Sequence, residues 1–345
     1  MIAEIKHERP GVYSSYETSG LTAASAGGRK VAVVADAGSL KDGRDFYQWT
    51  SYSKAAADVG ECALSRMTQM AIRNGAGMVY GVPAGEDYDA AFETAAAIED
   101  VSVVVCDSAE LAVQQKLREM VETCSAARKE RIAVVGGKAR ETVTELVDRA
   151  KALDHERVVL VAPGMGDGSG GAMCAAAVAG AIAGTADPAL PLGGAQLYGL
   201  AGLEQSYDDS EIDALVQGGV TALETLAGAY YVVRGVTTRT TTGGSPDATW
   251  RELTTILVVD EVVPGLRNAL RAKFSRAKNT EQTRGAIRSQ TVMELEKRVS
   301  REIIDSYEDV TVSALEDDPT VCLVEFAFTV AHGLNQVWLS AHITI

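Results

Sequence analysis

The stretch from Val321 to Ile345 reads VCLVEFAFTVAHGLNQVWLSAHITI and decides how the rest of the chain is interpreted. In its first half, apolar side chains fall on every second position from Cys322 to Val330. After a turn predicted at His332-Gly333, the same alternation continues to the last residue. Period-two spacing puts such side chains on one face of a β-strand. The sequence therefore predicts two terminal strands, and a strand this apolar needs a partner in its own sheet or in another molecule.

The opposite end of the chain, residues 1–27, is predicted to be an extended arm. Its apolar residues Ile2 and Ile5 are scattered among charges, and a short strand is expected at residues 2–6. The motif Arg9-Pro10-Gly11-Val12-Tyr13 follows, in which proline blocks a helix and glycine allows a sharp bend. Residues 18–28 are small and polar, which is typical of a flexible connector.

From residue 29 the pattern changes to short apolar runs that alternate with helical stretches. The runs predict strands at residues 31–34, 78–82, 101–106, 132–135, 158–161 and 230–233. The stretches between them predict helices at residues 55–73, 88–98, 109–125, 141–153, 171–183 and 210–216. Strands that alternate with helices indicate a largely parallel sheet covered on both faces. This α/β body is expected to span residues 28–245.

The remaining residues, 246–345, are predicted to form a smaller α+β domain. It follows a loop at residues 237–246 that is rich in Thr, Gly and Ser. We expect a strand at residues 254–259, a helix that begins at Pro264, and a second helix capped by Asn279-Thr280 that reaches about Ile304. A further strand is predicted at residues 310–315, before the terminal pair.

Charge is unevenly distributed along the chain. The formal net charge is −15, which disfavours a general nucleic-acid binder because phosphates require a basic field. Residues 264–301 carry ten basic and three acidic side chains, a local surplus of seven positive charges in an otherwise acidic protein. Such a segment suggests a specific acidic partner, and the alternative is a solvated helix face.

Cysteines and targeting signals narrow the class further. The five cysteines form no C-x-x-C pair and several lie in apolar runs, which favours reduced core residues over disulfides or a metal site. The charged N-terminus does not resemble a signal peptide. The weakly polar run at residues 172–186 is too short and too rich in Ala and Gly to span a bilayer. We therefore expect a protein that is made in the cytoplasm and does not insert into a membrane.

The loop Pro163–Gly171, PGMGDGSGG, is the feature that most resembles an enzyme site. It follows a predicted strand and opens an Ala-rich helix, which is where phosphates often bind. It fits G-x-G-x-x-G at Gly166, Gly168 and Gly171, but it lacks the Lys-Ser/Thr ending of a P-loop. A nucleotide-binding α/β enzyme that uses residues 164–171 therefore stays open as the alternative function.

Hydrolytic and metal chemistry find less support in the sequence. Ser169 does not stand in a nucleophile elbow, because Asp167 occupies the position where G-x-S-x-G needs glycine. The four histidines, at positions 7, 155, 332 and 342, suggest neither an oriented catalytic base nor metal-ligand spacing. We predict no catalytic, cofactor-binding or metal-binding residue.

Taken in order, these pieces resemble the tail sheath proteins of contractile phage tails and tailocins over nearly the whole chain. Residues 9–13 resemble the R-P-G-V-Y motif of that family, and residues 175–188, which end in TADP, resemble the segment of its sheet-covering helix. Residues 231–238, YVVRGVTT, resemble a family strand that reads V-R-G-I-T-T. Residues 250–263, the basic helices and the paired terminal strands resemble its C-terminal domain. Each motif is short, whereas their order together with the arm is fairly specific.

The resemblance implies a subtilisin-like body without proteolytic activity. It implies a structural subunit of a contractile sheath, which polymerises helically around a tail tube and contracts to drive the tube through the target cell envelope. The implied partners are further copies of this chain, a tail tube protein, and baseplate and tail terminator proteins. The implied location is a virion tail or tailocin particle assembled in the host bacterial cytoplasm, with no cofactor.

The resemblance also implies how copies are joined. Arms of neighbouring subunits complete the sheet of the C-terminal domain, with a donated strand at about residues 336–345. The residues expected in these inter-subunit arms are Ile2, Ile5, Arg9, Pro10, Gly11, Val12, Tyr13, Val337, Leu339, Ala341, Ile343 and Ile345. The C-terminal domain is implied to lie against the tube, so its basic segment supplies tube-facing candidates. These are Arg267, Arg271, Lys273, Arg276, Lys278, Arg284 and Arg288.

Overall fold

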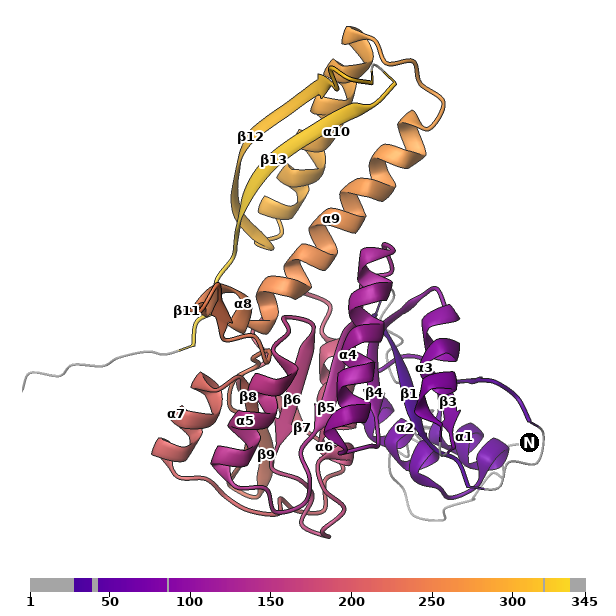
Figure 1. Cartoon of the computed structure of the whole chain (residues 1–345), viewed down its shortest axis with the longest axis vertical. Helices are drawn as coiled ribbons and strands as arrows, with labels where there is room; N and C mark the ends of the chain where they lie inside the picture. Colours follow the sequence, from indigo (N-terminus) through magenta and orange to yellow (C-terminus); the bar gives the residue numbers. More distant parts are fainter. Residues whose placement is uncertain (1–27, 39–42, 86, 319, 336–345) are drawn as a thin grey trace, which may run out of the picture.

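The computed structural model describes residues 28–38, 43–85, 87–318 and 320–335 (Figure 1). The strands predicted at residues 2–6 and 337–345 lie outside these ranges. A large mixed sheet covered by helices forms one part, and a smaller unit of two long helices and a β-hairpin stands on it (Figure 1). The predicted fold class is therefore confirmed, while the domain boundaries at residues 28 and 246 stay a prediction.

The large sheet has the strand order β2-β3-β1-β4-β5-β6-β8-β9-β7. The strands from β3 to β8 in this order are parallel, and β2, β9 and β7 pair antiparallel at the two edges. Their bounds are β1 Lys30–Asp36, β2 Tyr47–Trp49, β3 Val79–Ala84, β4 Val101–Cys106, β5 Ile132–Gly136, β6 Val158–Ala162, β7 Gln196–Leu197, β8 Val220–Leu226 and β9 Ala229–Val232. The central strands are apolar on both sides because helices cover both faces.

Two layers of helices enclose the sheet. One layer consists of α1 Tyr52–Val59, α2 Ala63–Arg73 and α6 Ala172–Gly184. The other consists of α3 Tyr88–Ala97, α4 Leu111–Ala126, α5 Val143–Leu153 and α7 Asp209–Gln217. Alternate residues of each central strand belong to the two resulting cores, as Val31 and Ala32 of β1 do. In the part of the chain that the structure describes, no helix has the length and apolarity needed to cross a membrane.

Small residues let α2 and α6 pack at close range. A Cβ atom added to Gly180 would lie 2.3 Å from the carbonyl oxygen of Ala71, and one added to Gly184 would lie 2.8 Å from Cα of Gly75. Larger side chains at these positions would push the two helices apart. This contact gives a physical reason for the small-residue stretch that the sequence carries at residues 175–188.

The body differs from the prediction in one helix and in three strands, β2, β7 and β8, which were not predicted. The helix predicted at residues 55–73 is two helices, because Gly60 has a left-handed φ of +77° and ends α1. Strand β8 lies inside the sheet, parallel to β6 and antiparallel to β9. Only its first four residues are buried, so its apolar pattern is short.

The smaller unit begins after a hairpin of β10 Thr241–Thr242 and β11 Ser245–Pro246. It contains α8 Ala248–Arg251, α9 Leu253–Phe274, α10 Glu281–Val299, β12 Ile304–Ala314 and β13 Cys322–Val330. The strands β12 and β13 pair antiparallel, and β12 packs on α10. A separate core joins them, formed by Val258 and Val262 of α9, Leu295 of α10 and Val310 of β12, with Phe326 and Phe328 packed against it.

The strand predicted at residues 254–259 and the helix start predicted at Pro264 are both wrong, because α9 runs through both positions. Its successive turns are buried against two cores: Leu253, Ile256 and Leu257 join the body core, and Val258 and Val262 join the core of the smaller unit. Burial on two sides thus overrides the β-propensity of the run. Pro264 cannot donate to the carbonyl of the residue four before it.

Next to that interruption, the α10 residue Arg298 reaches over α9. Its guanidinium donates a hydrogen bond to the carbonyl oxygen of Glu261 at 3.2 Å. A Cβ atom on Gly265 would lie 2.0 Å from Nη2 of Arg298, so the glycine makes room for the arginine. Arg298 is buried and also bonds to the backbone of Glu294 on its own helix. This contact fixes how α9 and α10 cross.

Candidate functional site

The β12–β13 hairpin is the first candidate interaction site. Its inner face carries the alternating side chains that the sequence predicted, from Cys322 to Val330, and of these Phe326, Phe328 and Val330 pack against the core of the smaller unit. Its outer face is exposed and carries Glu308, Thr311, Leu323 and Glu325 among others. Within the described residues, this sheet has two strands only, so each strand has one edge that pairs with nothing. Such edges are templates for an added strand.

The register shows which backbone groups of β13 point to the open edge. Leu315 N–H donates to the carbonyl oxygen of Val321 at 3.1 Å, and hydrogen-bonded pairs alternate with non-bonded pairs along an antiparallel ladder. Leu323 therefore bonds to β12, whereas Val324 directs its N–H and C=O away from it. The outward residues by this alternation are Cys322, Val324, Phe326, Phe328 and Val330. The edge offers donors and acceptors along its whole length.

The seven basic candidates do not form one uniform face. Four of them are engaged within the chain: Arg267 pairs with Glu130 at 2.9 Å, Lys273 bonds to Gln290, Arg284 to Asn279 at 3.0 Å, and Arg288 to the carbonyl of Val310 at 2.9 Å. Arg271, Arg276 and Lys278 are exposed near the junction of α9 and α10. These three are the members best placed to meet a partner.

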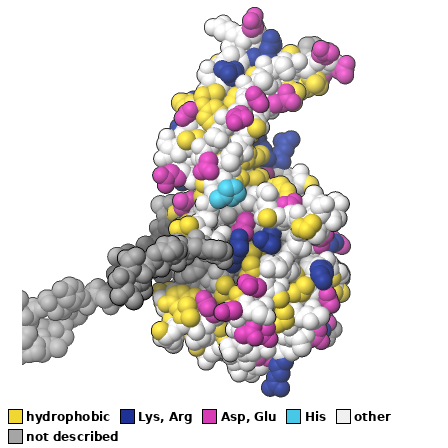
Figure 2. Space-filling model, turned by 90° about the vertical axis from the view of Figure 1, so that its left-hand side faces the viewer, with side chains coloured by type: hydrophobic (Ala, Val, Ile, Leu, Met, Phe, Trp, Pro, Cys, Tyr) yellow, Lys and Arg dark blue, Asp and Glu magenta, His cyan; other side chains and the backbone are white. Residues whose placement is uncertain are grey.

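An acidic turn lies beside this basic junction. Glu316, Asp317 and Asp318 connect β12 to β13 and are exposed. The side-chain amide of Asn279, between α9 and α10, donates to the carbonyl oxygen of Val321 at 3.2 Å and so ties the two loops together. Both charge types gather on the smaller unit in the space-filling view (Figure 2). The tip of this unit therefore carries both signs of charge, which the one-dimensional charge count did not reveal.

Polar contacts join the smaller unit to the body. Arg157 at the start of β6 forms two bonds with the carboxylate of Asp260 on α9, at 2.8 and 2.9 Å, and both side chains are largely buried. Burial raises the pKa of Asp260, while the ion pair with Arg157 opposes that shift. Arg267 adds its bridge to Glu130 further along the same helix. Sequence reasoning did not find this joint, because nothing in the pattern pairs positions so far apart.

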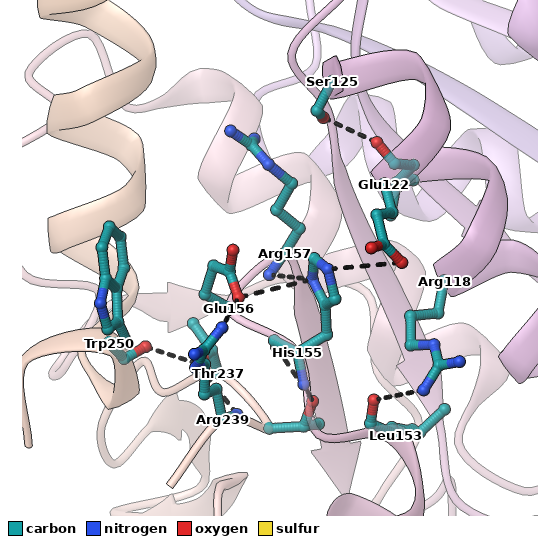
Figure 3. Close-up of polar contacts among 12 residues, drawn as sticks. Arg118, Glu122, Ser125, Leu153, His155, Glu156, Arg157, Thr237, Arg239 and Trp250 are labelled. Carbon is teal, nitrogen blue, oxygen red and sulfur yellow. Dashed lines mark hydrogen bonds and ion pairs between the residues drawn. The ribbon is translucent and has the colours of Figure 1, made fainter. Parts of the chain in front are cut away.

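Polar side chains surround His155 next to this joint (Figure 3). His155 Nδ1 accepts a hydrogen bond from the backbone N–H of Arg157 at 3.0 Å, and its Nε2 lies 3.9 Å from Glu122. Glu156 lies 3.8 Å from Nδ1 and bonds to Arg239 at 2.8 Å. Burial lowers the pKa of His155, although both nearby carboxylates act to raise it. Nδ1 of the ring therefore serves as a hydrogen-bond acceptor for the backbone before β6.

The loop at residues 163–171 has little capacity to hold a phosphate. Its amides already donate within the protein: Met165 to Gly170, Gly166 to Gly202, and Gly171 to Gly137, all at 3.0 Å. The amide of Ser169 and its hydroxyl donate to the carboxylate of Asp167 at 2.9 and 2.6 Å, which lowers the pKa of that carboxyl and keeps a negative charge in the loop. An anion would meet occupied donors and a like charge.

The glycines of this loop serve close packing. A Cβ atom on Gly171 would lie 2.7 Å from Cα of Gly136, and one on Gly164 would lie 2.6 Å from the backbone of Gly170. The loop is thus folded onto itself and onto the end of β5. In the described part of the chain, no group of three or more potential metal ligands comes together.

The inter-subunit arm residues predicted from the sequence cannot be placed. All of them lie in residues 1–27 or 336–345, outside the described ranges. The described chain nonetheless fixes where the C-terminal segment departs. After β13, residues 331–335 run down toward α8 and the body (Figure 1).

The fold and its surfaces define an α/β protein that carries an open-edged β-hairpin on a helical support. Comparison with known proteins shows which family has this arrangement. Residues 81–238 match the family model of the phage tail sheath protein central domain, and residues 245–344 match that of the phage tail sheath C-terminal domain. The chain belongs to the phage tail sheath protein family.

Individual relatives agree with the family. The tail sheath protein of Bacillus phage SP01 is 26% identical over 253 residues, which cover 70% of this chain and 43% of that protein. This chain thus spans less than half the length of that relative. Among solved structures, the sheath tail protein from Listeria innocua is similar with a TM-score of 0.71 at 14% identity, covering 89% of this chain and 93% of that one.

A second solved structure represents an assembled state. The helical sheath of the anti-feeding prophage in its contracted state is similar with a TM-score of 0.70 at 13% identity, and the match covers 99% of both chains. At this identity the likeness establishes a shared fold.

Proposed function

We propose that this chain is a structural subunit of a contractile tail sheath, which polymerises helically around a tail tube and contracts to drive the tube through the target cell envelope. The observation that carries the proposal is the hairpin with two open strand edges in a member of the tail sheath family. Strands donated by neighbouring copies would pair with these edges, and each backbone hydrogen bond contributes a net ~0.5–1.5 kcal/mol. Repeated through a lattice, modest joints give avidity.

The terminal segments supply the strands to be donated. Residues 337–345 alternate apolar and polar side chains, and residues 2–6 offer a shorter second strand. We assign residues 1–27 and 336–345 as arms, residues 28–245 as the sheath body and residues 246–345 as the C-terminal sheath domain. A head-to-tail contact of this kind is heterologous, and heterologous contacts build helical assemblies when they do not close into a ring.

The partners and location follow from the same assignment. Besides further copies of this chain, they are a tail tube protein and baseplate and tail terminator proteins, within a virion tail or tailocin particle assembled in the host bacterial cytoplasm. Among the tube-facing candidates, this proposal favours Arg271, Arg276 and Lys278, because their side chains are exposed. Nucleic acid and membrane insertion have no part in it, and no cofactor is required.

A nucleotide-binding enzyme is the weaker alternative. It would need free amides in residues 164–171 to bind phosphate, and those of Met165, Gly166, Gly168, Ser169 and Gly171 donate to protein acceptors instead. The sheath proposal therefore includes no catalytic role for Ser169 or for the loop.

Truncation tests the proposal. Deleting residues 338–345 should leave a soluble, folded monomer, because both cores of the body lie within residues 31–257. The truncated protein should form no tubes by electron microscopy under conditions in which the full chain forms them. Within sheaths of the full chain, a cysteine at position 341 should cross-link between subunits. Intramolecular cross-links, or contractile sheaths built from the truncated chain, would refute strand donation.

A further inference from the structure

The segment that follows β13 is seated on the body. Ala331 N–H still donates to the carbonyl oxygen of Ile303 at 3.4 Å, which closes the base of the hairpin. Two residues later, Gly333 lies against Pro191, which belongs to the body loop after α6. The chain therefore passes from the hairpin to the body within residues 331–333. The point from which residues 336–345 depart is set by the body as well as by the hairpin.

The contact between Gly333 and Pro191 is too close for any other residue. A Cβ atom on Gly333 would lie 2.0 Å from Cγ of Pro191, 3.0 Å from its Cδ and 3.1 Å from its Cβ. Gly333 does not have a left-handed φ, so backbone strain does not explain the glycine. The close approach explains it, because the proline ring occupies the volume that a side chain needs.

The body side of this contact is firmly held. Leu192, next to Pro191, is buried in the body core, and a Cβ on Gly235 would lie 2.8 Å from its Cβ. Arg234 pairs with Glu252 across the same place. These groups and residues 332, 333 and 335 line part of an open pocket of about 240 Å³. Pro191 is thus a fixed support on which the departing segment rests.

We propose that the Gly333–Pro191 contact is a positioning contact that fixes the exit of the C-terminal arm to the sheath body. The arm then pivots beyond Gly333 and not at the end of β13, so its delivery to a neighbouring copy follows the orientation of the body. This inference rests on the proposed function, in which residues 336–345 are donated. Gly333 acts through the placement of the arm and makes no contact with the partner itself.

The test uses the full chain and one methyl group. In Gly333→Ala the added Cβ meets Pro191, whereas in the control Gly285→Ala it meets open space on α10. Amide hydrogen exchange of residues 331–335 in the monomer should become about tenfold faster in G333A and stay unchanged in G285A. The protein concentration needed for sheath assembly should rise about tenfold in G333A alone.

A second substitution separates this contact from general damage. Pro191→Ala removes Cγ and Cδ, the two nearest atoms, and leaves Cβ 3.1 Å from the new methyl group. The double variant G333A/P191A should therefore recover wild-type assembly, which a misfolded or merely destabilised chain would not do. The inference is overturned if G333A exchanges and assembles like G285A, or if P191A fails to rescue it. If the wild-type chain forms no sheath but amide exchange is still faster in G333A than in the wild type, the proposed function fails, while the Gly333–Pro191 contact is supported.

Discussion

The open edge of β13 can be tested by two proline substitutions at adjacent positions. Val324 directs its N–H outward by the ladder alternation, and Leu323 directs its N–H toward Ser313 of β12. Proline removes the N–H group, so Val324→Pro should impair the outer edge and Leu323→Pro the hairpin itself. Both variants place a proline in β13 at adjacent positions. They differ in which edge of the strand loses its N–H donor.

The magnitude follows from the hydrogen bonds at stake. A donated strand that covers half of the outer edge forms about five backbone bonds, together worth ~2.5–7.5 kcal/mol net. Val324→Pro removes one donor and its ring displaces the neighbouring strand, so about two bonds, or ~1–3 kcal/mol, are lost from each joint. This corresponds to a roughly 5- to 150-fold weaker joint. Leu323→Pro instead costs the monomer ~1 kcal/mol or more, because its own ladder is broken.

Two assays separate these outcomes. Urea unfolding of the monomer should give a smaller drop in midpoint for V324P than for L323P. Sedimentation and electron microscopy should show that V324P needs a much higher concentration to form sheaths. Wild-type assembly of V324P would refute the open-edge reasoning, and so would equal monomer destabilisation by both variants.

The other expectations concern charge. Arg276→Glu with Lys278→Glu should weaken co-sedimentation with tail tube severalfold at low salt and less at high salt, with little change in thermal unfolding; unchanged binding at low salt would contradict the tube-facing assignment. Acidification should destabilise the fold through His155, because its pKa is lowered by burial: below the ordinary value of 6.5 the unfolded chain takes up the proton first. Asp260, whose pKa is raised, takes up its proton first in the folded state and opposes this trend at lower pH. His155→Gln should flatten the loss of urea stability between about pH 7 and about pH 5, and an unchanged slope would assign the loss to other groups.

The sequence predicted the body well because its signal is local. Runs such as Val31–Val34 and Val101–Cys106 are buried on both faces, so apolarity alone marks them. Thr280 was correctly predicted as a helix cap, and its hydroxyl accepts from the amide of Thr283 at 3.2 Å. In each case the deciding interactions lie within a few residues of the position concerned.

The errors arose where distant contacts decide the structure. Residues 254–259 read as a strand because they are β-branched and apolar, yet contact with two separate cores makes them a helix. The partner surface expected on the basic segment stays a prediction, although Glu130 and the Val310 carbonyl engage two of its members within the subunit. The Gly333–Pro191 contact joins positions more than a hundred residues apart, so no local sequence pattern predicts it.

The way α9 joins the two units bears on where movement takes place if the chain contracts as proposed. Leu257 and Val258 are neighbours in the chain but belong to the body core and to the core of the smaller unit, so one helix is shared by both. Rotating the units against each other would bend this helix and break the largely buried pair of Arg157 and Asp260. Arg267 and Glu130 hold a second point further along. The shared helix and these two ion pairs therefore oppose rotation of the units within one subunit.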